Sequence, residues 1–291
     1  METFTRTIPD YYAINNLSKL NTIFHKRDYF ISINPTRDFK TKLEKVSCGI
    51  IDGYFPFENC CIAGGSLNLL FDNSLDFNNP LFCKSDIDVY LYNSIIPKKI
   101  INYLIDKYGH QNVYIANTGY LLQIWITGIP KSLQLIRVSD YTPHSIINQF
   151  DYSHVKCFYD GSKIVFDKRF LNAVLTKTTI LNMRIHKRNG FVNDSAYLRI
   201  YKTIQRGYKI INDETNAELE INLENLKTNK KVKDYIEKPF IYPKEELTYE
   251  ENINEIKKYN SSIFFYTHIN NPAKDFHIKK MSFGSLLQIY E

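Results

Sequence analysis

Two aspartates at alternate positions, Asp86 and Asp88, are the side chains of this sequence best placed to do chemistry. The apolar residues between and after them predict a β-strand, in which alternate side chains share one face, so both carboxylates should lie on the same side. Neighbouring carboxylates repel each other unless a cation lies between them, and Mg²⁺ or Mn²⁺ prefers such oxygen ligands together with phosphates. The pair therefore predicts a metal site able to support phosphoryl or nucleotidyl transfer.

A turn of small residues, Gly64-Gly65-Ser66, lies upstream of the aspartates. It joins a short apolar strand that begins at Cys60 to a predicted helix. Backbone without side chains can approach a phosphate closely, and the start of a helix offers N–H groups that have no partner within the helix. One strand-helix-strand unit thus combines a predicted phosphate cradle with predicted metal ligands.

This arrangement resembles a known signature. Gly-Gly-Ser, a helix and then the run Ser85-Asp86-Ile87-Asp88-Val89 resemble the DNA polymerase β-like nucleotidyltransferases, which include CCA-adding enzymes, poly(A) polymerases and nucleotidylating toxins. The resemblance implies that Gly64, Gly65 and Ser66 bind a nucleotide. The interval between turn and aspartates is longer than the compact family pattern, and the loop at residues 72–80 accounts for the excess.

Enzymes of the resembled type use a third acid on a neighbouring strand to hold a second metal ion. The strand predicted at residues 133–138 should carry it, yet its candidate is Gln134, which has no negative charge. Asp151, in an element that loosely resembles the Arg-Asp-Phe-Thr element of CCA-adding enzymes, is the predicted third ligand, and Asp140 is the alternative. Without a third acid, the protein would bind nucleotide without turning it over.

A predicted helix at about residues 194–211 carries Arg199, Lys202 and Arg206 along one ridge. A row of cations on one helix face can bind a triphosphate or a nucleic-acid backbone. The alternative is an ordinary solvated face. The three cations are candidate nucleotide-binding residues.

Patterns along the chain predict an α+β protein, in which a mixed sheet with flanking helices is followed by a mostly helical C-terminal domain. We expect a nucleotidyltransferase head at residues 1–167, with its core at about 36–167, and a C-terminal domain at 168–291. A hairpin should turn at Asp160-Gly161. The other expected elements are helices at 36–52, 94–108 and 143–149 and strands at 113–116, 120–127 and 133–138.

The composition is that of a packed globular chain, since 44% of its 291 residues are hydrophobic and 14% are aromatic. The longest apolar run, residues 120–130, is interrupted by polar residues and is shorter than the roughly 20 residues that cross a membrane. The first residues lack the apolar segment of a signal peptide. Five cysteines without metal-ligand spacing fit buried thiols in a reducing compartment. We expect a cytoplasmic protein with no membrane partner.

These features predict a transferase that moves a nucleoside monophosphate from an NTP, with ATP expected, to an acceptor hydroxyl. Asp86, Asp88 and Asp151 would be its catalytic and metal-binding residues. A net charge of +6 favours a polyanionic acceptor, and the leading expectation is template-independent addition to an RNA 3′ end. Two alternatives stay open. One is a toxin-type nucleotidyltransferase that modifies a protein, a tRNA or a small molecule, and the other is a catalytically silent nucleic-acid-binding subunit on the same fold.

Overall fold

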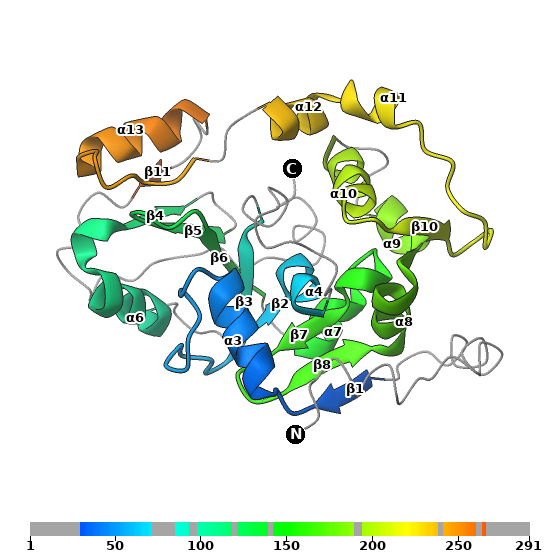
Figure 1. The fold of residues 1–291 in the computed structure, drawn as a ribbon, viewed down its shortest axis with the longest axis horizontal. Helices are drawn as coiled ribbons and strands as arrows, with labels where there is room; N and C mark the ends of the chain where they lie inside the picture. The colour runs from blue at the N-terminus through cyan, green and yellow to red at the C-terminus, as the bar shows by residue number, and fades with distance from the viewer. Residues whose placement is uncertain are drawn as a thin grey trace.

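The structure is a computed structural model that describes residues 30–71, 85–92, 98–117, 121–138, 142–188, 194–237, 241–259 and 264–265. In this part of the chain a mixed β-sheet forms the centre, and helices pack on both of its faces (Figure 1). The predicted α+β class, a mixed sheet with flanking helices, is confirmed. No helix among the described residues is long and apolar enough to cross a membrane.

The main sheet contains nine strands among the described residues, in the order β1-β8-β7-β2-β3-β6-β5-β4-β11. Neighbouring strands are antiparallel, except that β3 and β6 are parallel. The strands are β1 Phe30–Ile33, β2 Cys60–Ala63, β3 Ile87–Leu91, β4 Val113–Asn117, β5 Leu121–Ile126, β6 Ser132–Arg137, β7 Cys157–Tyr159, β8 Ile164–Asp167 and β11 Phe264–Phe265.

Helices and one small sheet complete the described structure. The small sheet pairs β9 Thr178–Leu181 in parallel with β10 Lys209–Asn212. The α-helices are α3 Arg37–Val46, α4 Gly65–Phe71, α6 Lys98–Tyr108, α7 Pro143–Asn148, α8 Lys168–Thr176, α9 Met183–Arg188, α10 Asp194–Gln205, α11 Leu223–Lys227, α12 Lys230–Glu237 and α13 Tyr249–Tyr259, and the 3₁₀ turns are η1 His110–Asn112 and η2 Ser153–Val155.

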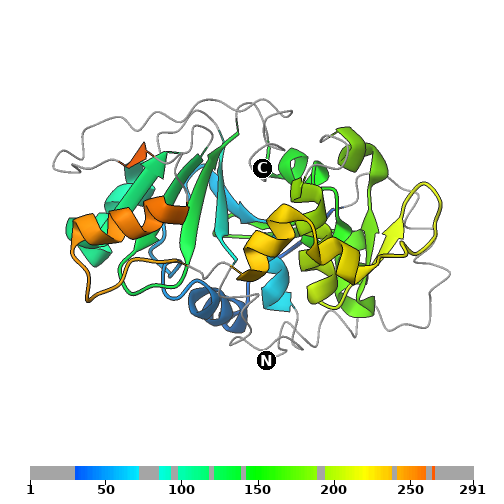
Figure 2. The same ribbon diagram turned by 90° about the horizontal axis from the view of Figure 1, so that it is seen from above.

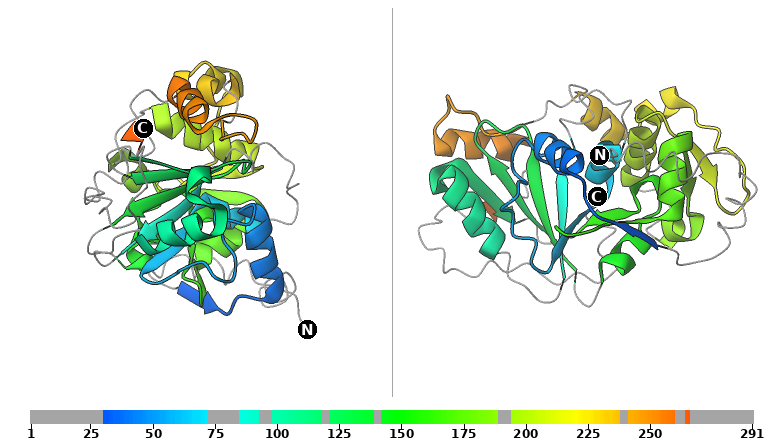
Figure 3. Two further views of the ribbon diagram at one scale, coloured as in Figure 1. Left: turned by 90° about the vertical axis from the view of Figure 1, so that its left-hand side faces the viewer. Right: turned by 60° about the horizontal axis from the view of Figure 1, so that its bottom comes forward.

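Each face of the main sheet packs against its own helices, because side chains alternate between the faces. On one face, side chains of β2, β3 and β6 join the largest core cluster together with α3, α4, α6 and α8. On the other face, Tyr90 and Ile136 pack with α7, and α13 covers β4 and β5 (Figure 2). The left view of Figure 3 has the strands between α13 (orange) and α3 (blue). Asp88 shares the second face with Tyr90.

The parallel pair β3 and β6 is the part of the sheet that carries the predicted chemistry. Parallel neighbours need a crossover connection, and here it contains α6, β4 and β5. The register pairs Asp88 directly with Gln134. The residue expected at the position of the third acid therefore lies next to Asp88 on the adjacent strand.

Helix α3 begins as predicted and ends earlier. The hydroxyl of Thr36 accepts a hydrogen bond from the backbone N–H of Phe39 at 3.1 Å, which caps the helix. The predicted extension to Asp52 is wrong because Cys48 and Gly49 have left-handed φ angles of 51° and 79°, which residues in a right-handed helix do not adopt. The last helical residue is Val46.

Helix α10 also ends before the predicted residue, at Gln205 instead of Ile211. Gly207 has a φ of 78°, and the backbone N–H of Tyr208 donates to the carbonyl of Thr203 at 3.2 Å. These features close the helix with a Schellman-type turn, and the next residues form β10 instead. The sequence interpretation missed this strand because it carried the helical period past the glycine.

The other predicted elements of the first half match the structure closely. Strands β4, β5 and β6 and helix α7 lie within two residues of their predicted bounds where the structure describes them, and α6 is described from Lys98. The hairpin β7–β8 turns at Asp160 and Gly161 as predicted. Of the five cysteines, Cys60, Cys61 and Cys157 are buried as expected, Cys48 is exposed, and Cys83 lies outside the described residues.

The described elements after residue 193 form two separate groups. Helices α10 and α12 pack together around Tyr201 and Val232. Helix α13 and strand β11 instead reach the far edge of the sheet, where β11 pairs with β4. The predicted division into domains at residues 167 and 168 stays a prediction.

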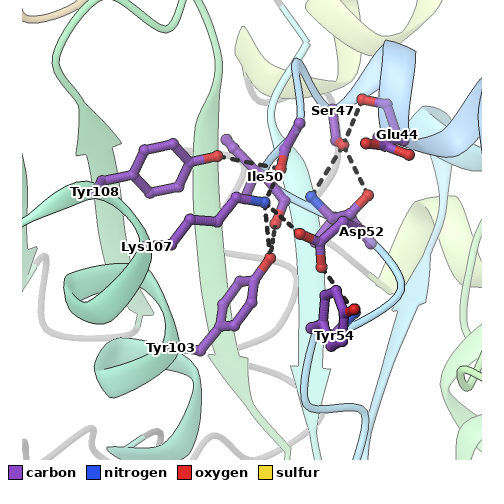
Figure 4. Close-up of polar contacts among 10 residues, drawn as sticks. Glu44, Ser47, Ile50, Asp52, Tyr54, Tyr103, Lys107 and Tyr108 are labelled. Atoms are coloured by element: carbon purple, nitrogen blue, oxygen red, sulfur yellow. Dashed lines mark hydrogen bonds and ion pairs between the residues drawn. The ribbon is translucent and has the colours of Figure 1, made fainter.

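A lysine fastens α6 to the segment that follows α3 (Figure 4). The ammonium of Lys107 donates to the carbonyl of Gly49 at 2.7 Å, to the Asp52 carboxylate and to the Tyr103 hydroxyl at 3.0 Å. Tyr108 donates to the same carbonyl at 3.1 Å. This cluster holds the left-handed turn at Gly49 against α6, and it includes none of the predicted site residues.

Candidate functional site

A cavity of about 330 Å³ brings together the site residues that the sequence singled out. Its lining includes strand-end residues of the main sheet, the turn between β2 and α4, and one side of α10. Lys231 of α12 also reaches it. All nine predicted residues line this one cavity: Gly64, Gly65, Ser66, Asp86, Asp88, Asp151, Arg199, Lys202 and Arg206.

The carboxylate of Asp86, just before β3, is held by neutral donors from β6. One carboxylate oxygen accepts a hydrogen bond from the Ser132 hydroxyl, and the other accepts from the amide nitrogen of Gln134 at 2.8 Å. Burial raises the pKa of Asp86, against the opposing influence of the Ser132 hydrogen bond and of the charges of Lys202 and Lys131. Gln134, which has no charge to offer a metal, thus fixes the orientation of Asp86.

A buried lysine holds the residue before Asp86 in place. Lys131, only 3% exposed, donates to the backbone carbonyl and to the hydroxyl of Ser85, each at 3.1 Å. It thereby fixes the residue that precedes Asp86. The sequence interpretation overlooked Lys131 and Ser132, since nothing local shows that they lie beside residues 85 and 86.

The glycine turn leaves room for other groups to approach its backbone. Gly64 has a φ of 90°, and a Cβ atom there would lie 3.9 Å from a carboxylate oxygen of Asp88. A Cβ atom on Gly65 would lie 3.1 Å and 3.2 Å from the terminal nitrogens of Arg206. The guanidinium therefore packs directly over the turn, which only a residue without a side chain permits without a shift.

Some buried polar atoms of the cavity lining have no hydrogen-bond partner among the described residues. They are the Ser66 hydroxyl, the Tyr152 hydroxyl and the Nε atom of Arg206. Leaving such groups unpaired costs about 1–3 kcal/mol each. Three unpaired donors in one cavity are the arrangement expected of a binding site for an anionic or polar ligand.

Two cations of α10, Arg199 and Lys202, and Arg206 just after its end line this cavity. Burial lowers the pKa of Lys202, whereas the charges of Asp86 and Asp88 act in the opposite direction. The Lys202 ammonium also lies 4.8 Å from the ring centre of Tyr235 in α12, a cation–π contact. Burial likewise lowers the pKa of Arg206. The solvated-face alternative therefore does not describe Lys202 and Arg206.

Asp151 lies in the same cavity within a different set of contacts. One oxygen of its carboxylate accepts hydrogen bonds from Nε of Arg199 at 3.2 Å and from Nδ1 of His186 at 3.3 Å. Burial would raise the pKa of Asp151, but the His186 hydrogen bond and the Arg199 charge outweigh it and hold the pKa below its usual value. Among the described residues, no three His, Cys, Asp or Glu side chains form a metal-binding group. Asp140, the alternative third ligand, lies outside the described residues.

A family model described as Gabija anti-defense 2 family protein (Gad2) matches residues 37–177. The matched region contains the Gly-Gly-Ser turn, both carboxylates of the β3 region and Asp151, and it stops before α10. No curated protein matches the chain.

Proposed function

We propose that this protein is a metal-dependent nucleotidyltransferase that moves a nucleoside monophosphate from an NTP, with ATP the expected donor, to an acceptor hydroxyl. One observation carries the proposal. Asp86 and Asp88 line the same cavity as Lys202 and Arg206, and the small-residue turn from Gly64 lies there too. Acidic groups suit a divalent cation, and basic groups beside bare backbone suit phosphates.

The donor set of the cavity fits Mg²⁺ or Mn²⁺ at the β3 carboxylates. Asp86 and Asp88 supply hard oxygen ligands, and both line the cavity. A bound ion would neutralise the two carboxylates and polarise a phosphate oxygen. The Ser132 and Gln134 hydrogen bonds support this arrangement because they orient Asp86 without neutralising its charge.

The remaining residues would bind and orient the triphosphate. Arg206 lies over Gly65 and has its Nε atom unpaired, so a phosphate at the turn can satisfy it. The Ser66 hydroxyl is a second unpaired donor at the same turn. Lys202 supplies a further positive charge in a partly desolvated site, where charge interactions are stronger than in water. Positioning and charge neutralisation, without a covalent intermediate, would account for the rate enhancement.

We propose an RNA 3′ end as the acceptor. The net charge of +6 supports a polyanionic partner. The match to a family described as Gabija anti-defense 2 supports a setting in which the reaction counteracts Gabija defense. In that setting, transfer of the nucleotide to a protein, a tRNA or a small molecule is the alternative within the same reaction class.

A second candidate function has its own observation. The position beside Asp88 in the register is occupied by Gln134, which donates to Asp86 and cannot supply a third negative charge. This favours a subunit that binds nucleotide on the same fold without turning it over. ATP binding with no product in Mg²⁺ or Mn²⁺ would select this candidate.

Primer extension tests the leading proposal. End-labelled RNA is incubated with the protein, each NTP separately, and Mg²⁺ or Mn²⁺. We expect Asp88→Asn to reduce extension by about 10²-fold or more, because it removes a charge needed to hold the metal. The matched control is Asp106→Asn, at an exposed position of α6 outside the cavity. Extension that survives in the Asp86→Asn, Asp88→Asn double variant would refute the site, and a nucleotide-sized mass shift of a non-RNA acceptor would refute the RNA assignment.

A further inference from the structure

We propose that Asp151 is a positioning residue, which holds Arg199 for the nucleotide phosphates and does not bind a metal ion. The proposal rests on the proposed function, because it assigns Arg199 to the same nucleotide. It replaces the expectation that Asp151 completes a second metal site. The observation that carries it is the pair of nitrogen donors bonded to the Asp151 carboxylate.

One carboxylate oxygen of Asp151, Oδ2, already accepts two hydrogen bonds. Arg199 and His186 both donate to Oδ2, at 3.2 Å and 3.3 Å. Asp151 is 7% exposed, so little water competes for this carboxylate. A metal ion at the same carboxylate would be brought next to the Arg199 guanidinium, and two cations at one buried anion repel each other.

The backbone fixes Asp151 to the same elements that carry its partners. Its carbonyl accepts a hydrogen bond from the N–H of Asn182 at 2.7 Å, and the next residue, Tyr152, forms a β-bridge with Leu181. Asn182 in turn accepts the N–H of His186 at 2.9 Å. Asp151 and His186 therefore keep a fixed relation at the start of α9, as a positioning contact requires.

Arg199 connects Asp151 to the proposed phosphate-binding part of the cavity. It lies in α10, one turn before Lys202 and two turns before Arg206, and all three line the cavity. Arg199 uses its Nε atom for Asp151. A guanidinium has further N–H donors in a fixed plane, so holding one edge orients the rest of the group. Asp151 thus restricts the orientations of a phosphate-binding cation without touching the phosphate.

The low pKa of Asp151 agrees with this role. His186 and Arg199 outweigh the effect of burial, so the carboxylate stays ionised at neutral pH and its charge is already balanced by a bonded cation. Asp86 differs, because its bonded partners Ser132 and Gln134 are neutral. A charge that is available for a metal ion is thus found at Asp86 and not at Asp151.

The test measures ATP binding to the full chain by calorimetry, once in EDTA and once with increasing Mn²⁺. In EDTA we expect Asp151→Asn and Arg199→Gln each to weaken ATP binding by about 10-fold, and the double variant to be no weaker than Arg199→Gln alone. The Mn²⁺ concentration at half-maximal enhancement of binding should be the same for Asp151→Asn and wild type. Asp88→Asn is the matched metal-site variant, in which that Mn²⁺ concentration should rise.

Two results would overturn the inference while leaving the proposed function intact. The first is a raised Mn²⁺ requirement in Asp151→Asn with unchanged ATP binding in EDTA. The second is a double variant whose loss of affinity is the product of the two single losses. Wild-type protein that binds no ATP in either condition would instead refute the proposed function together with this inference. Should Asp151→Asn not fold, Asp151→Glu takes its place, with the same unchanged Mn²⁺ requirement expected and a raised one contradicting the inference.

Discussion

Asp86 and Asp151 line one cavity, Asp86 half-buried and Asp151 buried, and their surroundings differ in charge. Asp86 receives hydrogen bonds from a hydroxyl and an amide, and its pKa is raised, chiefly by burial. Asp151 receives hydrogen bonds from a guanidinium and an imidazole, and its pKa is lowered despite burial. Burial alone therefore does not determine what a carboxylate in this cavity can do.

Under the proposed function, the difference separates a metal-binding carboxylate from a positioning one. The folded state holds Asp86 as an anion at a cost that a bound cation would offset. It holds Asp151 as half of an ion pair, so loss of that charge would leave the partly buried Arg199 beside a neutral group. A substitution at Asp86 should therefore mainly reduce activity, whereas a substitution at Asp151 should also reduce stability.

The largest expected effect is on activity at Asp86. Asp86→Asn keeps the shape of the side chain and removes its charge, so we expect RNA primer extension to fall by about 10²–10³-fold. The thermal midpoint at pH 7 should not fall, because the raised pKa of Asp86 means that its ionised form destabilises the folded state. Calorimetry and primer extension on the same preparation measure both. A large loss of thermal stability would contradict the contrast with Asp151.

A loss of stability is expected at Asp151. Asp151→Asn should lower the free energy of unfolding by about 3 kcal/mol, because it removes the charge of the buried Asp151 carboxylate from its ion pair with Arg199. Urea unfolding monitored by circular dichroism measures this. Asp106→Asn, on the exposed face of α6, should leave the free energy unchanged within about 0.5 kcal/mol. Equal stability of wild type and Asp151→Asn would show that the ion pair contributes nothing to the fold.

A smaller effect is expected from substitution of Gln134. This substitution changes the orientation of the Asp86 carboxylate and leaves its charge in place. Gln134→Leu removes the hydrogen bond to Oδ2 and leaves the carboxylate in place, so the Mn²⁺ concentration needed for half-maximal extension should rise by about 10-fold. Titration of Mn²⁺ at fixed ATP measures it. An unchanged Mn²⁺ requirement would mean that Gln134 does not orient a metal ligand.

The smallest expected effect is in the pH dependence of stability. A raised pKa in the folded state means that ionised Asp86 destabilises the fold at pH 7, and that this penalty disappears as the pH falls through the folded-state pKa toward the ordinary value of 3.8. The stability difference between Asp86→Asn and wild type should therefore shrink as the pH falls. For Asp151, whose pKa is lowered, the sign is opposite, and its stabilising contribution is lost only below the ordinary value. Urea unfolding at a series of pH values distinguishes the two signs.

Local sequence was sufficient to predict the elements that carry the β3 carboxylates and the glycine turn. Strict alternation around Asp88 placed it on the face shared with Tyr90, and the small residues from Gly64 marked the turn before α4. The predicted helix ends were less accurate because each depends on a single backbone conformation. Left-handed φ angles at Cys48 and Gly49 follow the end of α3, and one at Gly207 follows the end of α10; the hydrophobic period alone does not show this.

The partners of the two aspartates could not be predicted in the same way. Asp86 is bonded by Ser132 and Gln134, and Asp151 by His186 and Arg199, all of them far away in the sequence. Which strands become neighbours and which helix returns to the sheet are decided by tertiary packing, which a local pattern does not contain. The residue types of the site were therefore predictable, whereas the charge environment of each residue was not.

The parallel pairing of β3 with β6 has a consequence for how the chain acquires its site during synthesis. Asp86 and Asp88 are synthesised before α6, β4, β5 and β6, and β6, whose side chains orient Asp86, is the last of these elements to be made. At roughly 5–20 residues per second, the intervening chain takes several seconds to be made. A nascent protein would therefore have both aspartates in place, and no oriented site, until this long-range contact closes.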